Sequence, residues 1–304
     1  MKSFVLILLC PFFLISQNYI QEVDSLIEAK KYEQAVKKLE VYISKTPQDI
    51  ALIELMGDAY GFQSNWAKAV SCYKQLLDLN PKNATYHYKY GGVLGKLAKE
   101  ERKLSGIGQI SRVKTSFITA TELDPSHINV RWALVELYTQ LPSFLGGSYK
   151  KALIYADQLE QLSESNGYFA KAYVYEKSDK IASAKTYYKK GLNTCNELGC
   201  FQSEVLDSTH LNMHTNFLHF LVATACVLHS TRLTVGQQHI DYYIDNNSSK
   251  DSEPLEAAYL LQAQLFKLQN KISEAIASID QALLLKPNFA EALKEQQLIL
   301  LLKP

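Results

Sequence analysis

The chain has 304 residues, which is enough for one elongated repeat domain or for two compact domains. Apolar residues make up 47% of the sequence and charged residues 21%, proportions that are ordinary for a globular protein. The formal net charge is +1. Bulk nucleic-acid binding usually comes with a strong basic excess, so no nucleic-acid partner is expected.

The first residues have the pattern of a secretory signal peptide. Lys2 is followed by an apolar run from Phe4 to Ile15 and then by the small residue Ser16. This run is shorter than the roughly 20 residues that span a bilayer. Residues 1–16 are therefore predicted to be a signal peptide, and the mature chain is expected to be periplasmic or secreted, with no integral membrane segment. The alternative is that the run forms an apolar first helix of the folded domain.

Export would permit disulfides in the mature chain. Its four cysteines would be Cys72, Cys195, Cys200 and Cys226. Cys195 and Cys200 bracket a short loop, so a bridge between them and two free thiols are both open interpretations.

The clearest pattern in the remaining sequence is a repeat of about 34 residues. Within residues 50–83, Gly57 is followed by Tyr60, then by Ala69 and finally by Pro81. A small residue, an aromatic residue, a second small residue and a closing proline are typical of a helix-turn-helix repeat. The small residue lets the second helix approach closely, and proline stops that helix because it lacks an N–H. Aligned alanines at the second helices are Ala35, Ala69, Ala152, Ala184 and Ala275, and the closing prolines are Pro47, Pro81, Pro125 and Pro287.

The pattern predicts an all-α fold, an α-solenoid of about six to seven helix pairs that spans residues 17–304. The clearest repeats are 50–83, 165–194 and 256–289, and a degenerate pair is expected at 17–49. Residues 84–164 are irregular because the pair at 84–127 is enlarged and the pair at 128–164 is stretched by a loop. Residues 195–253 match poorly, and their apolar segments Phe217–Leu228 and Gln237–Ile244 are interpreted as one more pair. Residues 289–302 are predicted to form a C-terminal capping helix.

These residues resemble a tetratricopeptide-repeat protein, and the resemblance covers nearly all of the mature chain. It implies a right-handed solenoid whose concave groove binds peptides or partner proteins, without catalysis. The segments Leu104–Lys114 and Leu141–Gly147 resemble insertions in a group of exported bacterial repeat proteins. They are also distantly similar to the repeat domain of eukaryotic regulators of microtubule dynamics. Neither likeness implies an enzymatic activity.

The resemblance places the partner-binding groove at fixed positions of the first helix in each pair. Aromatic side chains interleaved with both charge signs suit a protein or peptide ligand. Trp132 is also open to a second interpretation, as a core residue between pairs. The groove positions are Glu54, Asp58, Phe62, Tyr88, Lys96, Trp132, Glu136, Phe169, Tyr173 and Glu176.

The enlarged third pair offers an alternative function. Six basic residues and two acidic residues lie between Lys96 and Lys114, and Gly106 and Gly108 interrupt the helical pattern. Such a basic helix end could hold a small anionic ligand or an envelope component. The other interpretation is an ordinary solvated helical hairpin. The candidate anion-binding residues are Arg102, Lys103, Arg112 and Lys114.

Two further features are considered for chemistry. The Gly146-Gly147 pair could form a ligand-binding loop or a turn from which the next helix restarts. Histidines are concentrated late in the chain, where they could hold a metal or occupy polar positions on partly buried helices. With neither a His-Glu-x-x-His nor a Gly-x-Ser-x-Gly motif in the sequence, no catalytic residue, metal or cofactor is expected. The histidines concerned are His210, His214, His219, His229 and His239.

Overall fold

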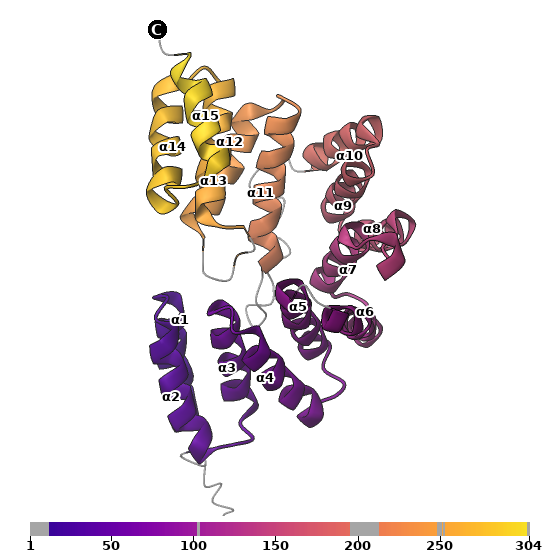
Figure 1. The fold of residues 1–304 in the computed structure, drawn as a ribbon, viewed down its shortest axis with the longest axis vertical. Helices are drawn as coiled ribbons and strands as arrows, with labels where there is room; N and C mark the ends of the chain where they lie inside the picture. The colour runs from indigo at the N-terminus through magenta and orange to yellow at the C-terminus, as the bar shows by residue number, and fades with distance from the viewer. Residues whose placement is uncertain (1–11, 102–103, 195–212, 248–250, 252, 303–304) are drawn as a thin grey trace, which may run out of the picture. The chain divides into compact units, whose positions relative to one another are not determined.

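The computed structural model describes residues 12–101, 104–194, 213–247, 251 and 253–302, and these residues form fifteen α-helices and no strand (Figure 1). The prediction of an all-α fold is confirmed, and the arrangement is consistent with an α-solenoid. The chain divides into two compact units, Met1–Pro125 and Ser126–Pro304. Each unit is a row of helical hairpins in which every helix packs on the helix that follows it.

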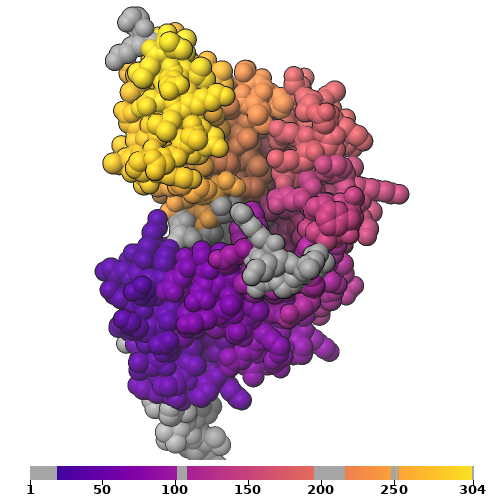
Figure 2. Space-filling model, in the orientation of Figure 1, coloured from indigo at the N-terminus to yellow at the C-terminus, as the bar shows by residue number. Residues whose placement is uncertain are grey.

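The described residues of the first unit, coloured indigo to purple in Figure 2, form three hairpins. Leu39, Leu52, Leu76 and Leu94 lie in its core, each almost fully buried. The predicted pairs 17–49, 50–83 and 84–127 correspond to these hairpins, and the third is longer than the others, as the sequence indicates. The helices are α1 (Phe12–Glu28), α2 (Tyr32–Lys45), α3 (Ile50–Phe62), α4 (Trp66–Leu79), α5 (Ala84–Glu101) and α6 (Leu104–Leu123).

The described residues of the second unit form four hairpins and a final single helix. The poorly matched segment 195–253 contains the hairpin of α11 and α12, and α15 is the predicted capping helix. A short 3-10 helix, η1 (Ser143–Leu145), stands between α7 and α8. The helices are α7 (Ile128–Gln140), α8 (Tyr149–Leu162), α9 (Glu164–Lys177), α10 (Ile181–Thr194), α11 (Met213–Leu228), α12 (Leu233–Asp245), α13 (Leu255–Leu268), α14 (Ile272–Leu285) and α15 (Ala290–Leu300).

The turns inside the hairpins share one backbone device. In five of the described hairpins, the second residue after the first helix has a left-handed backbone, at φ between 47° and 59°. The α11–α12 turn has one further such residue, Arg232 at φ 47°. The hairpin of α7 and α8 differs, because its longer connection uses Gly146 at φ 87°. A tight turn of this kind aligns two antiparallel helices. The five residues are Lys30, Ser64, Asp179, Ser230 and Asn270.

Small residues bring the helices of a hairpin together where the sequence predicts it. A Cβ atom added at Gly57 would lie 2.9 Å from the Tyr73 ring, and one added at Gly91 would lie 2.6 Å from the Phe117 ring. In each case the aromatic ring of the second helix lies directly on the backbone of the first. These two glycines therefore set how closely α4 packs on α3 and α6 on α5.

The N-terminal prediction falls largely outside the described residues. Of the predicted signal peptide 1–16, only residues 12–16 are described, and they belong to α1. Export therefore stays a prediction. Across the described ranges, none of the helices has both the length and the apolar character needed to cross a bilayer.

Candidate partner-binding face

Two predicted groove carboxylates lie on one side of α3. Asp49 precedes this helix and accepts hydrogen bonds from the backbone N–H groups of Ala51 and Leu52, at 3.1 and 3.2 Å. This N-cap satisfies donors that have no partner inside the helix. Residues four apart on a helix share a face, so Glu54 and Asp58 point in the same direction.

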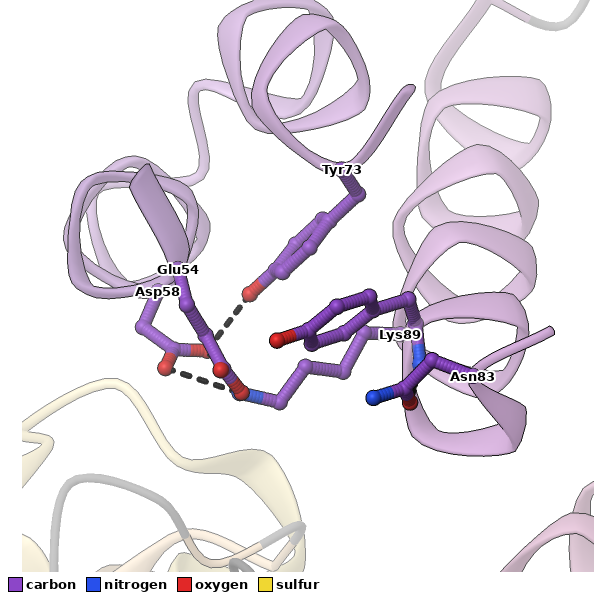
Figure 3. Close-up of polar contacts among 6 residues, drawn as sticks. Glu54, Asp58, Tyr73, Asn83 and Lys89 are labelled. Atoms are coloured by element: carbon purple, nitrogen blue, oxygen red, sulfur yellow. Dashed lines mark hydrogen bonds and ion pairs between the residues drawn. The ribbon is translucent and has the colours of Figure 1, made fainter. Parts of the chain in front are cut away.

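A lysine from the next hairpin joins these carboxylates. Asn83 caps α5 by accepting the backbone N–H of Tyr86 at 3.0 Å, and Lys89 follows in the next turns. The Lys89 Nζ donates to Glu54 Oε1 at 2.6 Å and to Asp58 Oδ2 and Oδ1 at 2.9 and 3.1 Å (Figure 3). Lys89 thus links α5 to α3, one hairpin to its neighbour.

Tyr73 completes this cluster from α4. Its hydroxyl donates to Asp58 Oδ1 at 2.5 Å, and Figure 3 shows its ring pointing toward the carboxylates. Burial raises the pKa of Tyr73 well above its usual value, and the negative charge of Asp58 adds to the effect. Tyr73 therefore stays a hydrogen-bond donor. Glu54, Asp58, Tyr73 and Lys89 are called the lysine network below.

Lys89 keeps its charge although its side chain is only 9% exposed. Burial lowers the pKa of this ammonium, but the charges of Asp58 and Glu54 outweigh burial and raise the pKa above its usual value. Two carboxylates surround one ammonium, so the lysine network carries a net charge of −1. The Glu54 side chain is its most exposed carboxylate, at 28% against 14% for Asp58.

Three other predicted groove residues lie in the first unit. Phe62 at the end of α3 is half-buried and stacks on Tyr32, with ring centroids 5.4 Å apart. Tyr88 on α5 is half-buried beside Phe117, at 6.2 Å, and Lys96 farther along α5 is exposed. Tyr88 and Lys96 therefore add an aromatic surface and a charge to the helix that carries Lys89.

The prediction that Trp132 on α7 lines the groove is wrong, because this residue is buried. Its side chain is 1% exposed, its Nε1 donates to Asn166 Oδ1 at 2.6 Å, and Phe217 meets its ring edge-on at 6.0 Å. The core interpretation holds, because this indole packs between hairpins of the second unit. Phe169 is likewise fully buried, against Tyr188. Neither residue is available to a partner on the surface.

The remaining groove positions belong to polar pairs in the second unit. Tyr173 accepts a hydrogen bond from Gln140 Nε2 at 3.2 Å, and burial raises its pKa. Glu176 accepts the Tyr188 hydroxyl at 2.6 Å, while Glu136 is half-buried on α7. These side chains are accessible in part, but no buried lysine network like that of Lys89 joins them among the described residues.

The predicted anion-binding residues are only partly described. Arg102 and Lys103 lie outside the described residues. Arg112 on α6 is exposed, yet its guanidinium donates to the Tyr90 hydroxyl and lies 5.7 Å from that ring. Lys114 is half-buried. Arg112 therefore has a structural partner on α5, and nothing in this geometry favours an anion site.

The histidines do not converge on a metal site in the described part of the chain. His219 and His239 are fully buried with ring centroids 4.7 Å apart, and His219 also stacks on Tyr242 at 4.3 Å. Burial lowers the pKa of His219 to about 3, with His239 adding to the effect, and that of His239 to about 4. No group of three metal-ligating side chains occurs among the described residues. His210, like the cysteines Cys195 and Cys200, lies outside them.

Sequence reasoning missed Lys89, the centre of the lysine network. A signal for it exists, because Lys89 follows Glu54 and Asp58 by 35 and 31 residues, close to one repeat length. Opposite charges about one repeat apart lie on the first helices of two successive hairpins. These charges face each other when the hairpins stack side by side. Searching for such charge pairs would have found the network.

The fold and this inter-hairpin pairing define a helical-hairpin repeat protein. Residues 57–97 match the family of the TPR repeat, and residues 165–197 and 256–289 match the tetratricopeptide repeat. The chain thus contains tetratricopeptide repeats, as the sequence resemblance indicates. Such proteins are generally non-catalytic scaffolds with protein partners.

Solved structures share this fold at low sequence identity. A tetratricopeptide repeat protein from Parabacteroides merdae is 15% identical, with a TM-score of 0.50 over 93% of this chain and 98% of that one. A chain in the APC/C hetero-tetramer Cut9-Hcn1 is 12% identical, with a TM-score of 0.55 over 93% of this chain and 49% of that one. These likenesses show the fold alone. No match was found among curated proteins.

Proposed function

We propose that this chain is a non-catalytic scaffold that docks a segment of a partner protein on the face formed by α3 and α5. The observation that carries the proposal is the lysine network, where two carboxylates outnumber one lysine and Glu54 remains partly exposed. The partner segment would bring a basic side chain to Glu54. Tyr88 and Lys96 on α5 would add an aromatic contact and a charge contact.

The physical basis is preorganisation. Lys89 and Tyr73 hold Asp58 and Glu54 in fixed positions, so a partner would meet carboxylates whose rotamers are already set. Binding then orders fewer side chains, which lowers the entropic cost of association. A partly buried carboxylate also gives a stronger charge-assisted hydrogen bond than one in bulk water.

Site-specific photo-crosslinking in the native cell tests this proposal. A photoreactive amino acid at Tyr88 or at Lys96 should crosslink the same partner protein. The matched control position is Lys74 on α4, which is well exposed and lies on a second helix. Equal capture of that partner from Lys74, or no capture from Tyr88 and Lys96, would contradict docking on α3 and α5.

We also propose that the chain is exported. The apolar run from Phe4 to Ile15 after Lys2 supports this proposal. N-terminal sequencing of the protein purified from its native cell tests it. A mature chain that begins shortly after Ser16 is the expected result, and a chain that retains Met1 or Lys2 would contradict it.

A further inference from the structure

The connection between α7 and α8 displays an aromatic side chain to solvent. Phe144 in the 3-10 helix η1 is 82% exposed, the largest exposed fraction among the large hydrophobic residues that the structure describes. A projecting apolar ring of this kind is unfavourable in water. An apolar ring that is so exposed indicates that another surface covers it.

The backbone around Phe144 is fixed by hydrogen bonds. Leu145 N–H and Gly147 N–H both donate to the Pro142 carbonyl at 3.0 Å, and Ser148 N–H donates to the Tyr138 carbonyl at 2.8 Å. Gly147 lies so close to the chain that an added Cβ would come within 1.7 Å of the Leu141 carbonyl oxygen. The Gly146-Gly147 pair is therefore a turn that restarts the helix, and the hydrogen bonds around it fix the backbone from which Phe144 projects.

A second turn lies beside this loop. Tyr149, the first residue of α8, is exposed and donates its hydroxyl to the Lys177 carbonyl at 2.8 Å. Lys177 ends α9, and the turn after it leads to the exposed Ile181 at the start of α10. Residues 141–151 and 177–181 thus form one continuous edge of the second unit, called the Phe144 edge below.

The Phe144 edge is basic. Its lysines are all exposed, and Asp179 is its one acidic residue, so four positive charges less one negative charge leave +3. The whole chain carries only +1, so this edge holds a local concentration of positive charge. The four lysines are Lys150, Lys151, Lys177 and Lys180.

We propose that the Phe144 edge docks on the surface of a lipid bilayer that contains anionic lipids. Phe144 would enter the boundary between headgroups and acyl chains, and Tyr149 would lie at headgroup level, where amphipathic aromatic rings are enriched. The lysines would lie against the anionic headgroups, which attract basic segments over about a Debye length.

The shape of the edge favours a bilayer over an acidic protein segment. Phe144 projects from a fixed turn instead of lining a hollow, so a protein partner would have to supply a matching pocket. A bilayer interface accepts a projecting ring without a matching shape, and its charge is spread widely enough to meet all four lysines at once.

Vesicle flotation with the full chain tests the proposal. The protein should float with vesicles of phosphatidylcholine mixed with phosphatidylglycerol and stay unbound with phosphatidylcholine alone, and added salt should release it. Phe144→Ser should weaken binding about tenfold, because an apolar side chain of this size leaves the interface. Leu284→Ser on α14 is the matched control, since Leu284 is 75% exposed and far along the chain. It should leave binding unchanged.

Charge reversal gives a second, independent arm. Lys150→Glu combined with Lys177→Glu should weaken binding to the mixed vesicles at least about twentyfold, since each lysine near an anionic surface contributes roughly fivefold. The control pair is Lys271→Glu with Lys294→Glu, which makes the same charge change at exposed positions on the turn before α14 and on α15. This control variant should bind the mixed vesicles more tightly than the variant with Lys150→Glu and Lys177→Glu.

Three outcomes would overturn the proposal. The first is no flotation with the mixed vesicles at low salt. The second is an equal loss of binding in Phe144→Ser and Leu284→Ser, or in the two charge-reversal pairs. The third is tight binding to polyglutamate that depends on Phe144 and occurs without vesicle binding, which would assign the edge to an acidic polypeptide.

Discussion

The lysine network of the first unit and the histidine pair of the second unit bury basic side chains in opposite ways. In the first unit, Lys89 is buried as a cation between Glu54 and Asp58, and its pKa is raised. In the second unit, His219 and His239 are buried against each other as neutral rings, with pKa values of about 3 and about 4. A buried basic group is thus stabilised by counter-ions in the lysine network and by loss of its charge in the histidine pair.

The difference follows from the distance between each ordinary pKa and neutral pH. A lysine that lost its proton at pH 7 would cost about 5 kcal/mol, because its ordinary pKa lies more than three units higher. A histidine loses its proton near pH 6.5 at almost no cost. Burial therefore requires counter-ions for Lys89 but only a pKa shift for the histidines. We therefore expect the network to serve charge recognition and the histidine pair to make the second unit sensitive to acid.

The largest expected effect is acid destabilisation of the second unit. The unfolded histidines bind protons below about pH 6.5, whereas the folded ones stay neutral until far lower pH, so the stability that neutral burial preserves is lost as pH falls. Between pH 6.5 and about pH 4.5 the pair should lose on the order of 4 kcal/mol. Hydrogen exchange should show α11 and α12 opening over this interval before α3 and α5 do.

Replacement of the histidines separates their effect from general acid unfolding. His219→Asn combined with His239→Asn should flatten the pH dependence of exchange in α11 and α12, whatever the variant's stability at pH 7. An unchanged slope in this variant would mean that other groups cause the acid sensitivity. Burial of the two neutral histidines would then not explain the acid sensitivity of the second unit.

The next largest effect is expected at Lys89. Lys89→Met leaves two carboxylates close together without their cation, which should lower the free energy of unfolding by about 3 kcal/mol in urea titrations. Adding Glu54→Gln and Asp58→Asn to Lys89→Met should restore most of that loss, because the uncompensated charges are removed. A triple variant as unstable as Lys89→Met would show that packing, and not charge, dominates at this position.

A smaller effect should follow from moving Tyr73 away from Asp58. Gly57→Ala places a Cβ 2.9 Å from the Tyr73 ring, so it should cost about 1 to 3 kcal/mol of unfolding free energy. Gly61→Ala on the same helix meets nothing within 4 Å and should be neutral or stabilising by about 0.5 kcal/mol. Equal stabilities of the two variants would contradict the close packing of α4 on α3.

The smallest effect is expected at Lys171 on α9, which also pairs with two carboxylates. Its Nζ lies 2.6 Å from Asp157 Oδ1 and contacts Glu160, but the Asp157 side chain is 59% exposed. Water and salt screen such a pair, so Lys171→Met should cost about 1 kcal/mol or less. The loss of unfolding free energy caused by Lys171→Met should also depend on salt more than the loss caused by Lys89→Met. The two lysines are almost equally buried, at 12% and 9% exposed, so a loss as large as at Lys89 would show that the exposure of the carboxylates does not separate them.

The sequence predicts the helices well because each hairpin is a local unit. Closing prolines and small residues act within about 34 residues, so the expected pairs are present, including the poorly matched one at 195–253. The contacts between hairpins are less predictable. The sequence shows Glu54 and Asp58 on a first helix, but the partner Lys89 depends on how far the next hairpin is rotated and shifted.

The burial of Trp132 could not be predicted from the sequence either, and the reason lies within a single helix. Consecutive residues on a helix point about 100° apart, so an alignment error of one residue moves a side chain from the surface to the interior. α7 is also buried on several sides, since Val130, Leu134 and Val135 are fully buried as well. A helix of this kind has no single apolar face from which its exposed positions could be inferred.

The most direct test of the account is the affinity of the crosslinked partner for two matched carboxylate variants. Glu54→Gln removes a charge from the lysine network, and Asp157→Asn removes one from the exposed pair at Lys171. We predict that Glu54→Gln weakens partner binding at least about fivefold in titration calorimetry, since a charge-assisted hydrogen bond is lost, while Asp157→Asn leaves the affinity unchanged. Equal affinities of the two variants, or a larger loss in Asp157→Asn, would contradict the assignment of the partner to α3 and α5.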